Sequence, residues 1–156
     1  MTAEKQCLDK ALRLLGRRDH SCRELSQKLK QRGFSSELIA SAIEACKKMN
    51  YLDDRRFCEG YTRHLRRKGY GVMRIVHKLK EKGVAETHIR ESIEQQCQNA
   101  CQVEDCRRVI EKKMPAQQTR DRLFRFLYQR GFSNEVIKEA LRETADLWNS
   151  ERFGLS

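Results

Sequence analysis

The sequence predicts an all-α protein made of three tandem three-helix (helix-turn-helix-like) repeats that form an elongated, curved molecule. One proline and eight glycines among 156 residues suit a mostly helical chain. Charged residues at 35% and aromatic residues at 7% favour thin helical layers over one thick core. The third observation is an internal repeat about fifty residues long.

The repeat emerges when Gly33, Gly83 and Gly131 are aligned. A cation precedes each glycine, an apolar residue follows it, and aliphatic residues recur at fixed offsets. In chain order within a repeat, the matching positions are Leu25, Ile75 and Leu123; Leu29, Leu79 and Leu127; Arg32, Lys82 and Arg130; Phe34, Val84 and Phe132; Ile39, Ile89 and Ile137; and Ile43, Ile93 and Leu141. We therefore place the repeats at residues 1–49, 50–99 and 100–156.

Each of these glycines is predicted to end a helix in the left-handed conformation, which glycine adopts without a β-carbon clash. In such a Schellman cap, the apolar residue that follows the glycine packs on the apolar residue that lies four positions before the glycine. The pairs are Leu29 with Phe34, Leu79 with Val84, and Leu127 with Phe132.

Further signals place the remaining helix boundaries. Ser35 and Ser133 are predicted N-caps, and Ser21 with Glu24 predicts a capping box. One more helix opens each repeat, over residues 7–15, 54–68 after an Asp53 N-cap, and 101–114. Their apolar stripes are Leu8, Leu12 and Leu15; Phe57, Tyr61 and Leu65; and Val103, Cys106 and Ile110. Pro115 is expected to break the third repeat, and Asp146, Leu147 and Trp148 to cap it.

Positive charge is concentrated in the second repeat. Residues 54–82 hold ten Lys/Arg against three Asp/Glu, in a chain of net charge +11. On the helix predicted over residues 54–68, arginines occupy the arc opposite the apolar stripe, which indicates an anionic partner. Residues 83–114 sum to −1 and residues 115–156 to +1, so the third repeat is expected to serve packing or protein contact. Tyr70 has two open readings, base stacking or packing on Leu65.

No pattern for catalysis, a cofactor or a metal is recognisable. The segment Gly69-Tyr70-Gly71 follows no strand, and Cys97, Cys101 and Cys106 have no histidine among them. The third helices of the repeats are acidic or neutral, which disfavours sequence-specific operator reading and leaves phosphate-level contact with DNA. The seven cysteines are expected to be reduced. With no signal-peptide pattern and no long apolar run, we expect a cytoplasmic protein, most simply a monomer, with no membrane contact.

Five groups of residues form a recognisable set of motifs. They are Arg18-Asp19-His20-Ser21 with Glu24-Leu25 and Lys28-Leu29; Tyr51-Leu52-Asp53-Asp54 with Arg56-Phe57; Arg67-Lys68-Gly69-Tyr70-Gly71 with Arg74-Ile75; Arg125-Phe126-Leu127; and Arg130-Gly131-Phe132. Over residues 8–143 these motifs resemble the RecX family of bacterial recombination regulators. The chain departs from the family pattern at Val72, where many relatives have proline.

The resemblance implies a non-enzymatic modulator that lies along the groove of the RecA–DNA filament. It implies restraint of RecA's ATP hydrolysis and strand exchange, through blocked filament growth or promoted disassembly. The alternative is a general single-stranded DNA or RNA binding protein without a dedicated protein partner. We expect the anionic contact to be made by Arg56, Arg63, Arg66, Arg67, Lys68, Arg74 and Lys78, assisted by Arg17, Arg18 and Lys28.

Overall fold

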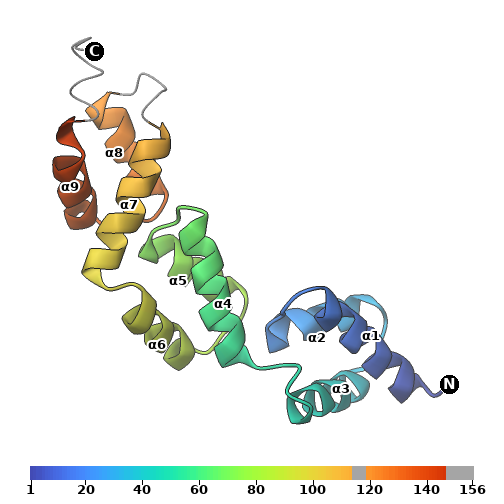
Figure 1. The fold of residues 1–156 in the computed structure, drawn as a ribbon. Helices are drawn as coiled ribbons and strands as arrows, with labels where there is room; N and C mark the ends of the chain where they lie inside the picture. Colours follow the sequence, from blue (N-terminus) through green and yellow to red (C-terminus); the bar gives the residue numbers. More distant parts are fainter. Residues whose placement is uncertain (114–118, 147–156) are drawn as a thin grey trace. The chain divides into compact units, whose positions relative to one another are not determined.

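A computed structural model of the protein describes residues 1–113 and 119–146 (Figure 1). These residues form nine α-helices and no β-strand, which confirms the all-α class and the three tandem three-helix repeats. The helices are α1 (Ala3–Arg17), α2 (Cys22–Gln31), α3 (Ser36–Lys48), α4 (Asp54–Arg67), α5 (Val72–Glu81), α6 (Glu86–Gln96), α7 (Asn99–Lys113), α8 (Arg120–Gln129) and α9 (Asn134–Glu143).

The chain divides into two compact units, which are described separately below. Unit 1 comprises Met1–Tyr61 and Leu79–Ile89, and unit 2 comprises Thr62–Lys78 and Arg90–Ser156. The predicted Pro115 break and the predicted caps Leu147 and Trp148 lie outside the described residues. Among the helices of the described residues, none has the length and apolar character needed to cross a membrane.

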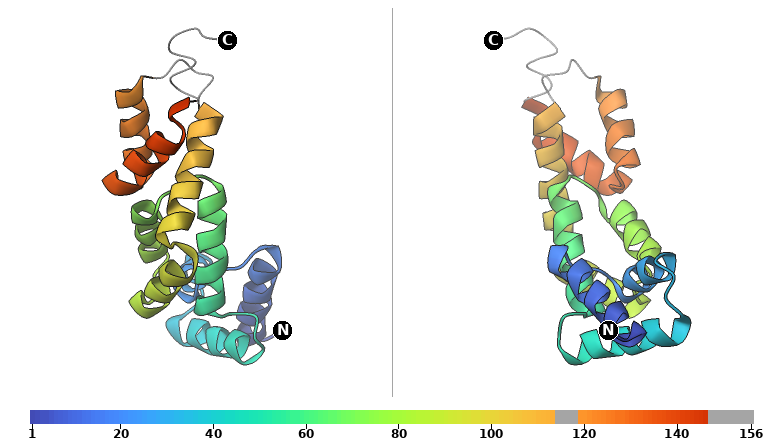
Figure 2. Two further views of the ribbon diagram at one scale, coloured as in Figure 1. Left: turned by 60° about the vertical axis from the view of Figure 1, so that its left-hand side comes forward. Right: turned by 90° about the vertical axis from the view of Figure 1, so that its right-hand side faces the viewer.

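In unit 1, helices α1, α2 and α3 pack around one apolar core (Figures 1 and 2). The residues of α1 that are fully enclosed are Cys7, Ala11 and Leu14. The predicted stripe of Leu8, Leu12 and Leu15 is therefore one residue out of register, because these leucines are only partly buried at the edge of the core. Small side chains at the centre of the buried face leave room for α1 to pack closely on α3.

In unit 2, helices α7, α8 and α9 enclose the second core (Figures 1 and 2). The predicted stripe of Val103, Cys106 and Ile110 is buried in it, as are Leu127 and Phe132. Helix α4 begins in unit 1 and ends in unit 2. Of its predicted stripe, Phe57 and Leu65 are buried and Tyr61 is half-buried.

The predicted glycine caps are confirmed at all three aligned positions. Gly33, Gly83 and Gly131 have φ of 90°, 73° and 101°. The amide that follows each glycine donates to the expected carbonyl, as Phe34 does to Leu29 at 3.4 Å. Gly69 ends α4 in the same way. Asn50, at φ 60°, ends α3, a cap that the glycine pattern did not reveal.

Ser21, Ser35 and Ser133 are confirmed as N-caps, and Asp53 accepts bonds from the amides of Arg55 and Arg56. Of the two hydrogen bonds in the predicted capping box, only the one accepted by Ser21 forms. The Ser21 hydroxyl does accept from the Glu24 amide, at 3.1 Å. The Glu24 carboxylate, however, turns toward Arg18 and Lys82, because two cations bind it more strongly than one amide.

Candidate anion-binding site

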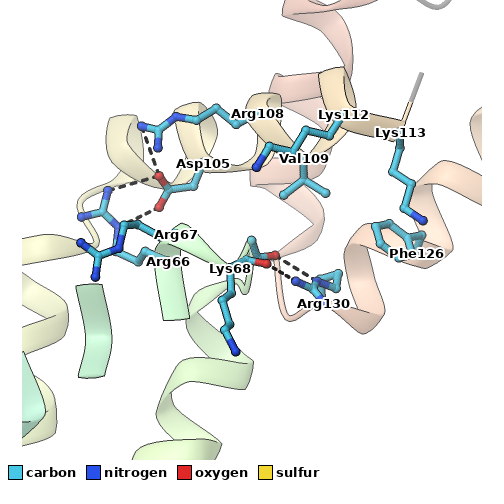
Figure 3. Close-up of a pocket in the computed structure, with 11 residues that line it drawn as sticks. Arg66, Arg67, Lys68, Asp105, Arg108, Val109, Lys112, Lys113, Phe126 and Arg130 are labelled. Atoms are coloured by element: carbon cyan, nitrogen blue, oxygen red, sulfur yellow. Dashed lines mark hydrogen bonds and ion pairs between the residues drawn. The ribbon is translucent and has the colours of Figure 1, made fainter. Parts of the chain in front are cut away.

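A basic pocket of about 620 Å³ lies in unit 2, between the C-terminal end of α4, helix α7 and the end of α8 (Figure 3). Asp105 is the one acidic residue among those that line it, and Val109 and Phe126 supply apolar surface. Its cations are Arg66, Arg67, Lys68, Arg108, Lys112, Lys113 and Arg130. We call this cavity the basic pocket.

Arg66 is fixed in the wall of the basic pocket by an ion pair. Its Nε and Nη2 donate to the two carboxylate oxygens of Asp105 at 2.7 and 3.2 Å. The Asp105 side chain is 5% exposed and that of Arg66 22% exposed, so the pair is largely shielded from water. A hydrogen bond from Arg66 to Asp105 raises the pKa of the guanidinium further. Arg66 was predicted to make the anionic contact, but its first role here is to join α4 to α7.

Arg130 closes another side of the basic pocket. Its guanidinium donates to the carbonyl oxygens of Lys68 and, at 3.1 Å, of Gly69, as the dashed lines in Figure 3 show. It also lies 4.0 Å from the centre of the Tyr70 ring. These contacts engage its Nε and one Nη without neutralising its charge.

Four other cations of the pocket have no carboxylate partner among the residues that the structure describes. They are Arg67, Lys68, Lys112 and Lys113. Lys113 lies over the Phe126 ring at 4.5 Å, while the side chain of Lys68 extends away from Arg130 (Figure 3). Arg108 shares Asp105 with Arg66, at 3.6 Å. One carboxylate therefore faces seven cations, and a phosphate or carboxylate ligand would relieve their repulsion.

Other predicted contact residues of unit 2 lie outside the basic pocket. Arg74 and Lys78 flank the Tyr70 ring, at 6.0 and 5.0 Å from its centre. With Arg130 they place three cations around the ring. Arg63 is exposed on α4.

In unit 1, the predicted residues Arg18 and Lys28 are engaged within the fold. Arg18 donates two bonds to Glu24, at 3.0 and 2.8 Å. The Lys28 amine lies 3.0 Å from Nε2 of buried His20, whose Nδ1 lies 2.9 Å from the Arg18 carbonyl oxygen. This geometry suits a neutral ring with the proton on Nδ1, and burial lowers the His20 pKa. Arg17 is exposed at the end of α1, and exposed Arg56 donates to the Asn50 carbonyl.

Four cations of the basic pocket come from the third repeat, which was expected to serve packing or protein contact. The net charges of residues 83–114 and 115–156 did not reveal these four cations, because acidic residues in the same stretches, including those of α6 and α7, cancel their charge in the sum. A usable signal was present in Arg108 and Lys112, which are four residues apart and so share one face of α7. They, with Lys113 and Arg130, join Arg66, Arg67 and Lys68 in one cavity.

In the part of the chain that the structure describes, no group of three or more His, Cys, Asp or Glu side chains could hold a metal ion. Burial raises the pKa of the Cys106 thiol to about 12 and that of Cys97 to about 11, which keeps both thiols protonated.

Comparison with known families decides the assignment. The chain matches the RecX first three-helix domain over residues 7–46, the second over 53–93 and the third over 100–141. The chain belongs to the RecX family. It is 40% identical over 146 residues to the regulatory protein RecX of Chlorobaculum tepidum, covering 89% of this chain and 88% of that protein. It is 37% identical over 143 residues to the regulatory protein RecX of Legionella pneumophila, covering 88% and 94%.

The RecX fold is also found among solved structures. The crystal structure of RecX from Lactobacillus salivarius matches with a TM-score of 0.78 at 19% identity, over 91% of this chain and 96% of that one. This likeness supports the order of helices in all three repeats.

Proposed function

We propose that this chain is a non-enzymatic negative regulator of a RecA-type recombinase. It binds in the groove of the RecA–DNA filament and inhibits ATP hydrolysis and strand exchange, by blocking filament extension or promoting disassembly. Membership of the RecX family, whose relatives are named regulatory proteins, carries this proposal. It acts in the cytoplasm as a monomer.

The basic pocket supplies the contact with the filament. Its uncompensated cations attract phosphate oxygens or the carboxylates of a protein surface, and neither requires a particular base sequence. Arg67 and Lys112 contribute charge that no carboxylate of the described residues offsets. Arg66 contributes by holding α4 on α7, so that the other cations converge.

Charge reversal tests this role. The double variant Arg67→Glu, Lys112→Glu leaves the Arg66–Asp105 pair intact and changes the net charge by −4. We expect at least a tenfold higher concentration for half-maximal inhibition of DNA-dependent ATP hydrolysis by RecA, with unchanged helical circular dichroism. The control Arg90→Glu, Lys138→Glu makes the same change at exposed residues of α6 and α9, outside the pocket. Equal loss in both variants would show that net charge alone matters.

The alternative function, general binding of single-stranded DNA or RNA, is favoured by the same uncompensated cations. It predicts that bare single strands bind as tightly as RecA-coated DNA. The logarithm of the affinity would then fall with the logarithm of salt concentration with a slope of about −0.7 per phosphate contacted. Tighter binding to the coated DNA supports the proposed function instead.

A further inference from the structure

The same pair of elements meets twice in this chain. One partner is the cation–glycine turn between the second and third helices of a repeat. The other is the start of the second helix of the preceding repeat. In unit 1 the Ser21 hydroxyl donates to the Lys82 carbonyl oxygen at 2.6 Å, and the Lys82 amine lies 2.7 Å from the Glu24 carboxylate. A β-carbon at Gly83 would lie 2.1 Å from Cδ of Arg23, so the turn is tightly covered.

The second meeting, in unit 2, follows the repeat alignment. The Gly71 amide, at the position of Ser21, donates to the Arg130 carbonyl oxygen at 2.8 Å. The Met73 amide donates to the Gly131 carbonyl oxygen at 3.1 Å. A β-carbon at Gly131 would lie 2.6 Å from Arg74, so this turn is covered as well.

The third cation–glycine turn, Arg32-Gly33, makes no such junction with the residues that the structure describes. Arg32 and Gly33 are exposed, and a β-carbon at Gly33 would have no atom within 4 Å. Beside the turn is a pocket of about 280 Å³, lined by Met1, Gln6, Asp9, Lys10, Arg13, Arg32 and Phe34.

The charge beside this free turn is positive and weakly compensated. Asp9 is the single acid in the lining, and no ion pair joins it to Lys10, Arg13 or Arg32 in the described part of the chain. Partial desolvation and the charges of Arg32, Arg17 and Arg13 lower the pKa of Lys10. Cations held this close favour an anionic partner.

We propose that the Arg32-Gly33 turn is a docking surface for the N-terminus of a helix in a partner protein, with a carboxylate in its first turn. The unit 1 junction is the template. There, a capping hydroxyl binds the carbonyl before the turn glycine, and a glutamate three residues later binds the turn cation. The proposal rests on the proposed function in taking a subunit of the RecA filament as that partner.

A second copy of this chain fits the surface poorly. Among the second helices of the repeats, α8 makes no such junction in the described part of the chain, and Thr119 is its capping residue. Arg122 then stands where Glu24 stands in α2, and the first-turn acid of α8, Asp121, lies one position earlier than the template requires. Arg122 would bring a fourth cation to Lys10, Arg13 and Arg32. A partner helix whose acid stands three residues after its capping residue, as Glu24 does after Ser21, complements these cations better.

Two variants test the proposal. Arg32→Glu reverses the turn charge. Gly33→Asn keeps a residue that tolerates the left-handed conformation but places a side chain on the docking surface. Lys48→Glu, at an exposed position of α3, is the control, because it makes the same charge reversal as Arg32→Glu away from the turn. Binding of each full-length protein is measured on single-stranded DNA coated with RecA and on the same DNA bare.

We expect both variants to lose at least tenfold in affinity for the coated DNA, and to match the wild type on bare DNA. The control Lys48→Glu should bind both the coated and the bare DNA with the affinity of the wild type. Unchanged binding of both variants to the coated DNA would overturn the docking surface while leaving the proposed function intact. If the wild type binds coated DNA no more tightly than bare DNA, both proposals fail. Self-association of the wild type that Arg32→Glu abolishes would overturn the proposal in favour of a second copy.

Discussion

The cation before the turn glycine is Lys82 in unit 1 and Arg130 in unit 2, and the two side chains bind different groups. Lys82 pairs with the carboxylate of Glu24, which Arg18 also binds. Arg130 instead binds two carbonyl oxygens and the face of Tyr70. Equivalent positions of one repeat therefore form a junction through a charged cluster in unit 1, and through backbone bonds and an aromatic ring in unit 2.

Because of this difference, the stability of each junction depends on a different kind of interaction. The unit 1 junction depends on three charged side chains, and so on pH. The unit 2 junction depends on close backbone approach, and so on the absence of a side chain at Gly71. A β-carbon there would lie 2.3 Å from both the Gly131 carbonyl carbon and the Phe132 amide nitrogen. Backbone atoms cannot move aside as a flexible side chain can.

The largest effect is expected from Gly71→Ala. The added methyl group must push apart two backbone segments and weaken the bond from Gly71 to Arg130, so the free energy of unfolding should fall by about 3 kcal/mol. Urea unfolding followed by circular dichroism measures this. Gly16→Ala, in α1, is the matched control, because its β-carbon would meet nothing within 4 Å. That change should stabilise the helix by about 0.5–1 kcal/mol. Equal unfolding midpoints for the two variants would refute the close approach.

A smaller effect is expected from Glu24→Gln in unit 1. The Glu24 side chain is 10% exposed, and burial alone would raise its pKa. The hydrogen bonds from Arg18 and Lys82 outweigh burial and lower the pKa to about 2. Because the Arg18 side chain is 49% exposed, water screens part of this interaction. We expect a loss of about 2 kcal/mol at pH 7.

The pH dependence of that loss is the sharper measurement. The folded pKa of Glu24 is below its ordinary value of 4.5, so the stabilisation is complete above pH 4.5 and disappears as pH falls toward 2. The difference between wild type and Glu24→Gln should shrink over the same interval. Glu37→Gln, at an exposed position of α3, should cost less than about 0.5 kcal/mol. A difference that stays constant from pH 7 to pH 2.5 would exclude the ion pairs as its cause.

Helix caps could be predicted from the sequence, because they depend only on neighbouring residues. Gly33, Gly83 and Gly131 end their helices as predicted, because a left-handed cap is decided by a few adjacent residues. The serine caps follow the same logic. The register of α1 was predicted wrongly, because the apolar pattern was assigned to the large leucines and not to Cys7 and Ala11 beside them. The small side chains of Cys7 and Ala11 suit the close packing of α1 in the core.

The candidate site could be predicted only in part, because its geometry depends on residues far apart in the chain. Arg66 and Asp105 are separated by 39 residues, and Glu24 and Lys82 by 58. No local pattern shows which arginine will be held by a buried acid and which will stay available. The cluster of Arg66, Arg67 and Lys68 was foreseen from charge density. Its completion by α7 and α8 required the fold.

The smallest effect, about 1 kcal/mol, is expected from Tyr70→Leu, which tests the aromatic part of the unit 2 junction. Leucine retains apolar bulk but removes the π face that Arg130 approaches at 4.0 Å, while the guanidinium keeps its bonds to the Lys68 and Gly69 carbonyls. Tyr70→Phe keeps the ring and should leave urea unfolding unchanged. Equal destabilisation by Leu and Phe would assign the effect to the hydroxyl. Because Arg130 covers the ring, affinity for single-stranded DNA should be the same in both variants. A loss of affinity confined to Tyr70→Leu would instead favour base stacking on Tyr70.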